Sequence, residues 1–220
     1  MAVGVQAKPT HLFKELSTSF GPQHWWPARS NFEVAVGAIL TQQTSWRSVE
    51  KAVKELRERK ILSPKSLASA PLKEIESCIR PTGFYKQKAI RLKKLARKFP
   101  RINKLTKSLT LLELRAELLE LDGVGKETAD SILLYAFNLP VLPIDAYTHR
   151  ITSRLYRFNG NYEELRAFYE CSLPKDQKIL NEFHALLVEL AKRHCWKRKP
   201  DCGNCPVRGQ CSFLKNNKLK

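Results

Sequence analysis

The chain of 220 residues is short of acidic side chains, with 21 aspartates and glutamates against 39 lysines and arginines, so its formal net charge is +18 at pH 7. It also lacks long apolar runs, because the longest, such as residues 34–40 and 132–137, fall far short of the ~20 residues that cross a bilayer. The first ten residues, MAVGVQAKPT, show no basic leader followed by an apolar segment, so we expect no secretory signal. These absences exclude a membrane-spanning helix and predict a cytoplasmic, reducing location.

The excess positive charge comes from two segments in which acids are almost missing. Residues 84–107 contain ten lysines or arginines and no acid, and residues 191–220 contain nine together with one acid, Asp201. A charge excess of this size indicates a polyanionic partner, either a phosphate backbone or an anionic membrane surface. A solvated basic surface is the alternative.

No stretch of the sequence shows the sustained alternation of apolar and polar residues that marks a half-buried strand. Apolar residues recur instead at helical spacing in 45–60, 85–99 and 176–194, with further short helices expected over 111–121 and 147–158. Proline and glycine breaks, including one at Pro100, divide the chain into roughly ten helices. Because 43% of the residues are apolar, the chain can bury a sizeable core, and the sequence predicts an all-α protein.

The segment 195–211 has almost nothing apolar to pack, yet it contains four of the six cysteines, spaced C-x6-C-x2-C-x5-C. Four thiolates can order such a segment by holding a [4Fe-4S] cluster or a tetrahedral zinc ion. The array favours iron-sulfur because zinc sites usually pair two short knuckles, and this array has one. Uncoordinated thiols are the third alternative. Cys78 and Cys171 stand singly in apolar helical patterns and are expected to be buried small hydrophobes.

Two further features can carry chemistry. The sequence LDGVGKETA at 121–129 lies between two helical stretches, and its glycines can turn the backbone tightly and direct free amides at an anion. A plain turn between helices is the alternative. Asp145 stands eighteen residues beyond Glu127 and directly before a helical stretch, so taken alone it is best interpreted as an N-cap. A cap is compatible with a functional role, because a helix terminus holds a carboxylate rigidly.

The hairpin, the aspartate and the cysteine array, in this order and spacing, resemble the helix-hairpin-helix DNA glycosylases of the endonuclease III superfamily, over about residues 32–211. The resemblance implies a two-domain α fold: a six-helix domain at 31–137 with its hairpin at 121–128, and a cluster domain built from 1–30 and 138–220 with a [4Fe-4S] loop at 195–211. The implied partner is double-stranded DNA containing damaged bases, bound by a monomer with no membrane role, near the nucleoid if the cell is prokaryotic.

The resemblance also implies residue roles. Asp145 would be the catalytic carboxylate, stabilising the oxocarbenium-like sugar as the base departs and activating water. A flipped nucleotide leaves a gap in the duplex, which inserted side chains would fill. The implied DNA contacts are Gln43, Phe84, Gly123, Val124, Gly125 and Lys126, commonly with a monovalent cation at the hairpin, and the implied cluster ligands are Cys195, Cys202, Cys205 and Cys211.

One position departs from the bifunctional members, which carry a lysine nucleophile where this sequence has Glu127. Lys126 is adjacent, but neighbouring helical positions differ by about 100° in direction. We therefore expect a monofunctional enzyme that uses water, with Glu127 in the catalytic site and β-elimination weak or absent. A borohydride-trapped adduct abolished by Lys126→Ala would contradict this.

The amino-acid sequence of the hairpin is most similar to that of the 3-methyladenine DNA glycosylases of the superfamily. This similarity implies N-alkylated purines such as 3-methyladenine and 7-methylguanine as substrates. Aromatic residues at corresponding positions line their base pocket, here Trp25, Trp26, Trp46 and Tyr147. Indole faces attract cationic rings, so the chemistry is consistent, although the tryptophans can equally be core.

Other interpretations stay open. The chain can be an endonuclease III-like glycosylase with AP lyase activity, or a mismatch glycosylase. From another class, it can be a non-catalytic DNA-binding protein that uses the hairpin and cluster to grip duplex, or an RNA-binding or zinc-structured module.

Overall fold

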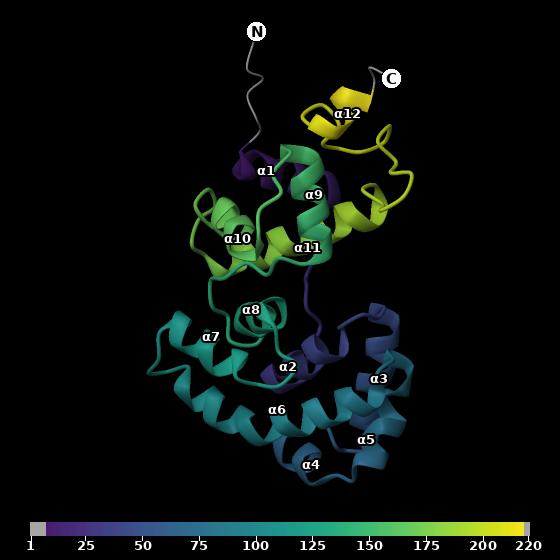
Figure 1. Cartoon of the computed structure of the whole chain (residues 1–220), viewed down its shortest axis with the longest axis vertical. Helices are drawn as coiled ribbons and strands as arrows, with labels where there is room; N and C mark the ends of the chain where they lie inside the picture. The colour runs from purple at the N-terminus through teal and green to yellow at the C-terminus, as the bar shows by residue number, and fades with distance from the viewer. Residues whose placement is uncertain (1–7, 218–220) are drawn as a thin grey trace. The chain divides into compact units, whose positions relative to one another are not determined.

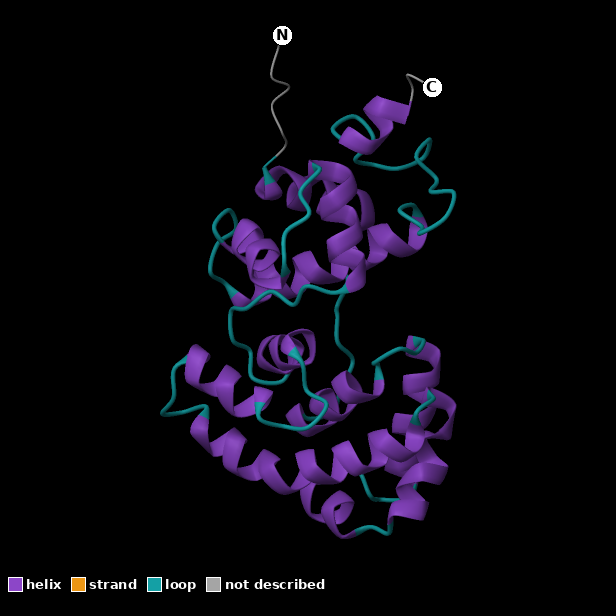
Figure 2. Cartoon of the chain, viewed as in Figure 1, coloured by secondary structure: helices purple, strands orange, loops and turns teal. Residues whose placement is uncertain are grey.

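The computed structural model describes residues 8–217, and within that range the secondary structure is helical with no strand (Figure 2). The helices run in chain order from α1 to α12, with one 3-10 turn, η1 (Figure 1). No helix among the described residues is long and apolar enough to cross a membrane. The all-α prediction is therefore confirmed.

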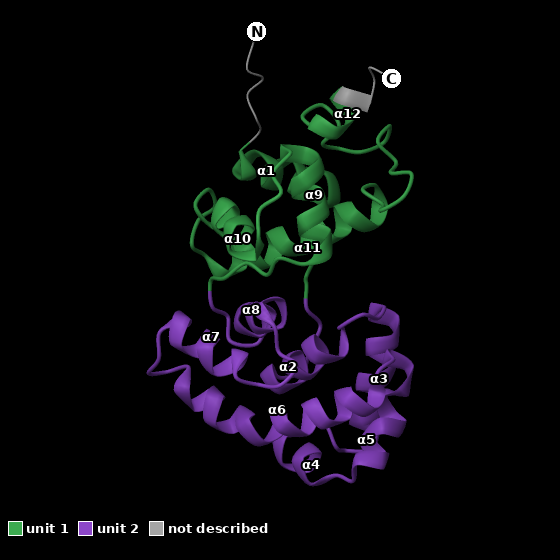
Figure 3. Ribbon diagram, in the orientation of Figure 1, with its two compact units in different colours: residues 1–25, 140–220 green, residues 26–139 purple. Residues whose placement is uncertain are grey.

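The chain divides into two compact units (Figure 3). Unit 1 comprises Met1–Trp25 and Pro140–Lys220, and unit 2 comprises Trp26–Leu139. The division expected from the sequence, at residues 31 and 137, differs from these boundaries by a few residues. The chain therefore leaves unit 1 near its N-terminus, builds unit 2 without interruption, and returns to complete unit 1.

Unit 2 contains the helices from α2 to α8, and its core lies around α2, which is buried on nearly all sides. Its long helix α6 packs against α4 and α5, and α7 packs against α8. The elements are α2 (Asn31–Leu40), α3 (Trp46–Glu58), α4 (Pro64–Ser69), α5 (Leu72–Ile79), η1 (Arg80–Thr82), α6 (Tyr85–Leu105), α7 (Leu111–Leu119) and α8 (Lys126–Tyr135).

Unit 1 is organised around α11, whose buried face includes Leu180, Phe183 and Leu187. Helices α1 and α9 both pack against it. The elements are α1 (Pro9–Phe20), α9 (Ala146–Tyr156), α10 (Tyr162–Glu170), α11 (Gln177–Arg193) and α12 (Ser212–Asn217).

Two sequence-based expectations about the fold are wrong. Pro100 does not end a helix, because α6 continues through it to Leu105. Phe99 and Ile102 on either side are buried, and their packing compensates for the hydrogen bond that a proline removes. Cys171 is exposed at the end of α10, whereas Cys78 is buried as expected.

Candidate functional site

The turn between α7 and α8 requires glycine at position 123. Gly123 has φ +76°, a left-handed conformation that side chains disfavour, and a Cβ there would lie 2.0 Å from the Arg91 Nε. The amides of Gly123 and Gly125 have no acceptor among the described residues, but the Val124 amide donates to the Leu121 carbonyl at 2.9 Å. Two of the three amides expected to face an anion are thus available, and the Val124 side chain is buried.

The two hairpin helices are joined by a buried ion pair. Arg115 on α7 donates from Nε to Asp130 Oδ1 on α8 at 2.6 Å, and from Nη2 to Oδ2 at 3.1 Å. The Asp130 side chain is fully buried, and the bidentate geometry fixes both helices in one orientation. The hairpin is therefore a rigid element rather than a mobile loop.

The two side chains expected to enter a duplex stand on turns of unusual backbone geometry. Gln43 follows α2 with φ 54°, and Phe84 precedes α6 with φ 46°. Both are exposed, and the Phe84 ring is 60% accessible, which is rare for a large apolar side chain. Left-handed backbone at residues with side chains costs about 1–2 kcal/mol each and persists only where the surroundings impose it.

The expected base-pocket residues are divided between the units. In unit 2, Trp26 packs against Trp46, with ring centroids 4.9 Å apart, and both line one cavity of about 230 Å³. The cavity also contains two carboxylates: Glu33, whose Oε1 accepts from Arg57 at 2.6 Å, and Glu50, whose Oε1 accepts from the Trp46 Nε1 at 3.0 Å. Arg57 lines the cavity as well, so the cavity is aromatic and contains two carboxylates and one guanidinium.

The other two expected pocket residues lie in unit 1, and each has a cation beside its ring. The Lys192 amine is 5.1 Å from the Trp25 ring centroid, and the Arg150 guanidinium carbon is 5.1 Å from that of Tyr147. The structure thus brings Trp26 and Trp46 together within unit 2.

Asp145 is the N-cap of α9, as the sequence predicted. Its Oδ1 accepts from the Thr148 amide at 2.7 Å, and its Oδ2 lies 3.6 Å from the His184 Nε2 on α11. The side chain is 15% exposed. Burial alone would raise the pKa of Asp145, but His184 and the Thr148 amide outweigh it and hold this pKa below its ordinary value. The carboxylate is therefore ionised at neutral pH and fixed in direction.

Glu127 and Lys126 both occupy the first turn of α8, and both are exposed. A carboxylate at a helix N-terminus interacts favourably with the helix dipole. Glu127 therefore suits its position structurally as well as in the catalytic role that the resemblance implies.

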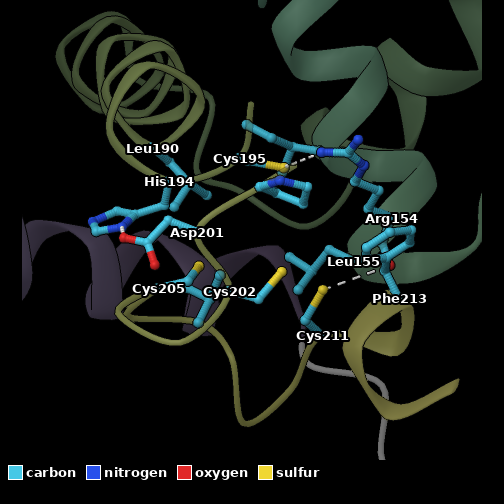
Figure 4. Close-up of a pocket in the computed structure, with 13 residues that line it drawn as sticks. Arg154, Leu155, Leu190, His194, Cys195, Asp201, Cys202, Cys205, Cys211 and Phe213 are labelled. Carbon is cyan, nitrogen blue, oxygen red and sulfur yellow. Dashed lines mark hydrogen bonds and ion pairs between the residues drawn. The ribbon is translucent and has the colours of Figure 1, made fainter. Parts of the chain in front are cut away.

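The four C-terminal cysteines line one cavity in unit 1, between the end of α11 and α9 (Figure 4). Burial raises the pKa of the Cys205 thiol to about 11. Burial also raises the pKa of Cys202, with further contributions from Cys211 and Cys195, so the sulfurs are close enough to influence one another. Across residues 8–217, no three histidine, cysteine, aspartate or glutamate side chains are arranged to hold a single metal ion.

Arg154 of α9 holds the start of the cysteine segment. Its Nη1 donates to the Cys195 Sγ at 3.3 Å and to the Trp196 carbonyl at 2.7 Å, and its Nη2 donates to the Lys197 carbonyl at 3.0 Å. Arg154 thus fixes the first cysteine of the array and the backbone of the two residues after it. The donor set, four thiols around one cavity with a cation beside it, fits a thiolate-bound group.

The basic segment of α6 is less available to a partner than its composition suggested. Lys88 is buried, and three other cations form ion pairs with acids of α7 and the hairpin: Lys94 with Asp122 at 2.8 Å, Lys98 with Glu120 at 3.8 Å, and Arg101 with Glu117 at 3.0 Å. In contrast, Lys197, Arg198, Lys199 and Arg208 are all exposed in the cysteine segment.

Sequence reasoning missed several residues that the structure places beside the site. His184 and Lys88 are polar side chains at apolar positions of helical patterns: His184 follows Leu180 by four residues, and Lys88 precedes Leu92 by four. A polar residue at a position where the helical pattern predicts an apolar one indicates a buried polar group. The pair between Glu33 and Arg57 joins residues 24 apart on two helices and had no local signal.

Comparison with known proteins identifies the family. Residues 36–175 match the model described as HhH-GPD superfamily base excision DNA repair protein. The chain belongs to the HhH-GPD superfamily. Among relatives of this superfamily, the chain is 43% identical over 207 residues to a Methanocaldococcus jannaschii protein named as a DNA repair glycosylase, covering 91% of this chain and 94% of the relative. It is 31% identical over 189 residues to endonuclease III of Thermotoga maritima, covering 84% of each.

Solved HhH-GPD structures show the same arrangement of elements. A non-covalent endonuclease III-DNA complex matches with a TM-score of 0.81 and 27% identity, covering 96% of this chain and 97% of that one. The 3-methyladenine DNA glycosylase of H. pylori, bound to 1,N6-ethenoadenine, matches with a TM-score of 0.74 and 27% identity over 84% and 98%. The protein is therefore a member of an enzyme family of DNA glycosylases, and the resemblance inferred from its motifs is confirmed.

Proposed function

We propose that this HhH-GPD protein is a monofunctional DNA glycosylase that flips N-alkylated purines such as 3-methyladenine and 7-methylguanine from duplex DNA and releases them by hydrolysis. The observation that carries the proposal is Asp145, an ionised carboxylate held by the Thr148 amide and His184 at a helix start. Such a carboxylate can stabilise positive charge that develops on a deoxyribose ring.

The proposed reaction breaks the bond between C1′ of the sugar and the base nitrogen. An N-alkylated purine carries a positive charge, so it departs as a neutral base and takes both electrons of the bond without needing an acid. Asp145 stabilises the resulting oxocarbenium-like sugar and accepts a proton from the water that attacks C1′. A single well-placed carboxylate is sufficient for this chemistry.

The Trp26 and Trp46 cavity supports an alkylated purine as the substrate. Indole faces stack on a flat ring and attract its positive charge, and the Glu50 carboxylate adds negative charge to the lining, whereas the Glu33 carboxylate is paired with Arg57. The H. pylori neighbour, a 3-methyladenine DNA glycosylase, agrees with this substrate class. Trp25 and Tyr147 remain proposed pocket residues on the strength of the resemblance alone.

DNA contacts are proposed for Gln43, Phe84 and the hairpin. The free amides of Gly123 and Gly125, together with the exposed Lys126, suit a phosphate at the N-terminus of α8. The monovalent cation implied at the hairpin stays an expectation. The exposed cations between Cys195 and Cys211 would add contacts to the phosphate backbone.

A [4Fe-4S] cluster is the proposed occupant of the cysteine cavity. A tetrahedral zinc would need its four sulfurs about 2.3 Å from one centre, whereas a cubane cluster spreads its ligands over four iron atoms. The array has one short C-x2-C knuckle, whereas zinc sites usually pair two, so we infer a cluster rather than zinc for these four thiols. When bound, the cluster would cross-link residues 195–211 and supply folding free energy there.

An endonuclease III-like glycosylase with AP lyase activity is the second candidate, because 31% identity to an endonuclease III favours it. The experiment uses duplexes containing alkylated, oxidised, deaminated or mismatched bases, each scored with and without alkali. We expect base release from alkylated duplexes, with strand cleavage only after alkali. Cleavage without alkali, or a borohydride-trapped adduct lost in Lys126→Ala, would support the second candidate instead.

A non-catalytic DNA-binding role predicts no base release from any duplex in this panel. Asp145→Asn provides the internal control, because it should bind the alkylated duplex while releasing base about 10³-fold more slowly.

A further inference from the structure

Lys88 is a buried cation inside unit 2. Its side chain is 1% exposed, although the preceding residues of α6, Lys86 and Gln87, are exposed. Lysine is almost never buried to this degree unless its charge is compensated. The groups around the Lys88 amine must therefore compensate its charge.

The Lys88 amine is surrounded by main-chain carbonyls. Its Nζ donates to the carbonyls of Leu40 at 2.9 Å, Gln42 at 2.8 Å and Thr82 at 2.8 Å. Three donors are the full capacity of an ammonium group. Leu40 and Gln42 belong to the end of α2 and the turn after it, whereas Thr82 belongs to η1. One amine therefore ties together two segments that are about forty residues apart.

These two segments are the turns that carry Gln43 and Phe84. Gln43 directly follows one acceptor, and Phe84 lies two residues after another. Both have left-handed backbone conformations, which surrounding contacts must maintain. The Lys88 ammonium supplies such contacts at the base of each turn.

Arg91, one helical turn beyond Lys88, connects the turn after α2 to the hairpin through the Gln42 side chain. Its Nη1 donates to the Gln42 Oε1 at 3.1 Å, and the Gln42 Nε2 donates to the Gly123 carbonyl at 2.8 Å. The Gln42 side chain also reaches the Thr128 hydroxyl at 3.0 Å. One face of α6 thus supports both turns and the hairpin.

We propose that Lys88 is a positioning residue that holds the Gln43 and Phe84 turns in one fixed relation, so that both side chains enter the duplex as a pair. The proposal rests on the proposed function, in which these side chains fill the gap left by a flipped nucleotide. Lys88 acts through the two turns, because its amine is buried against carbonyls and does not face a ligand.

The ammonium form is the one that this role requires, since a neutral amine would leave one of the three carbonyls without a donor. Burial, together with the neighbouring Arg91, lowers the pKa of Lys88 to about 8, so the charged form still predominates at pH 7.

The chain provides a matched control on the same helix. The Lys93 amine also donates to a main-chain carbonyl, that of Ala70 at 2.5 Å, but this carbonyl belongs to the end of α4. Lys88→Met and Lys93→Met each remove one charge and the carbonyl contacts of one amine. Only the first touches the two turns. Lys88→Gln keeps two donors and serves as a second variant if Lys88→Met does not fold.

The first measurement is hydrogen exchange of the free full-length protein, which does not depend on any DNA activity. In Lys88→Met we expect amides of 41–45 and 80–85 to exchange faster together, by about tenfold or more, with no change in Lys93→Met. Faster exchange in one turn only, or equally throughout unit 2 in both variants, would overturn the proposal.

The second measurement compares binding to a duplex with a tetrahydrofuran abasic analogue and to the same duplex undamaged. Lys88→Met should lower the preference for the abasic duplex by about tenfold while undamaged binding stays within twofold. A loss of stability alone would not change this ratio in protein shown to be folded by circular dichroism. An unchanged ratio in Lys88→Met would refute the role in DNA insertion.

The two measurements separate the proposals. If the wild-type protein showed no preference for the abasic duplex, the proposed function would fail, while hydrogen exchange would still decide whether Lys88 joins the turns.

Discussion

The candidate functional residues of the two units differ in how far their side chains are exposed to solvent. In unit 1, Asp145 is mostly covered and fixed at the start of a helix. In unit 2, Gln43 and Phe84 are exposed on turns. A carboxylate that stabilises developing charge works best where few water molecules compete with it, whereas a side chain that enters a duplex must protrude. The low exposure of Asp145 therefore suits a chemical role, and the high exposure of Gln43 and Phe84 suits insertion into DNA.

The units also differ in how their functional segments are stabilised. In unit 2, buried polar contacts lie beneath the exposed turns, from Lys88 and from the pair between Arg115 and Asp130. In unit 1, the cysteine segment buries little apart from Val207 and depends on Arg154 and the thiols. Unit 2 therefore stabilises its functional segments with its own polar contacts, while the end of unit 1 is expected to need the proposed cluster.

The largest effect should come from removing the charge in unit 1. Asp145→Asn keeps an N-cap but loses the negative charge, so we expect base release to fall about 10³-fold with duplex affinity retained. Single-turnover release of 7-methylguanine measures it. Asp176→Asn, which changes the N-cap of α11 in the same way, is the matched control and should keep its activity. Equal losses in both variants would contradict a chemical role for Asp145.

The next effect tests the rigidity of unit 2. Arg115→Met leaves the Asp130 carboxylate buried without its guanidinium, and should lower the free energy of unfolding by about 3–5 kcal/mol. Arg101→Met breaks the exposed pair with Glu117 and should cost about 0.2–1 kcal/mol. Urea denaturation compares the two. Similar costs would show that the buried pair is not what joins the hairpin helices.

A smaller effect tests the dependence of unit 1 on its cysteines. Cys205→Ser should abolish the absorbance near 400 nm that an iron-sulfur cluster produces, and should weaken duplex binding by about tenfold because residues 195–211 lose their order. Cys171→Ser, at an exposed cysteine far along the chain from the array, should change neither. A protein that is colourless as purified and as reconstituted with iron and sulfide would rule out the cluster.

The smallest effect concerns pH. The pKa of Asp145 lies below 3.8, so its carboxylate, and the stability that it contributes, should be lost only as pH falls through that lowered value. Base release, corrected for spontaneous loss, should therefore change less than about twofold between pH 7 and pH 5. A sharp decline over this interval would indicate that another group titrates.

Local patterns predicted much of this protein. The N-cap role of Asp145, the turn at Gly123 and the helices α3 and α11 depend on neighbours within a few residues, so the sequence was sufficient for them. The break at Pro100 was predicted wrongly, because burial of the residues around it outweighs a local preference.

The sequence by itself determined the helical class through its periodicity and the family motifs through their spacing, while the roles proposed for Asp145 and the four cysteines came through the resemblance that these motifs carry. Only the tertiary structure decided that Lys88 binds three carbonyls, that His184 faces Asp145, and that much of the basic face of α6 is already paired. Each of these joins residues distant along the chain, and whether a charge meets a partner or the solvent depends on which segments the fold brings together.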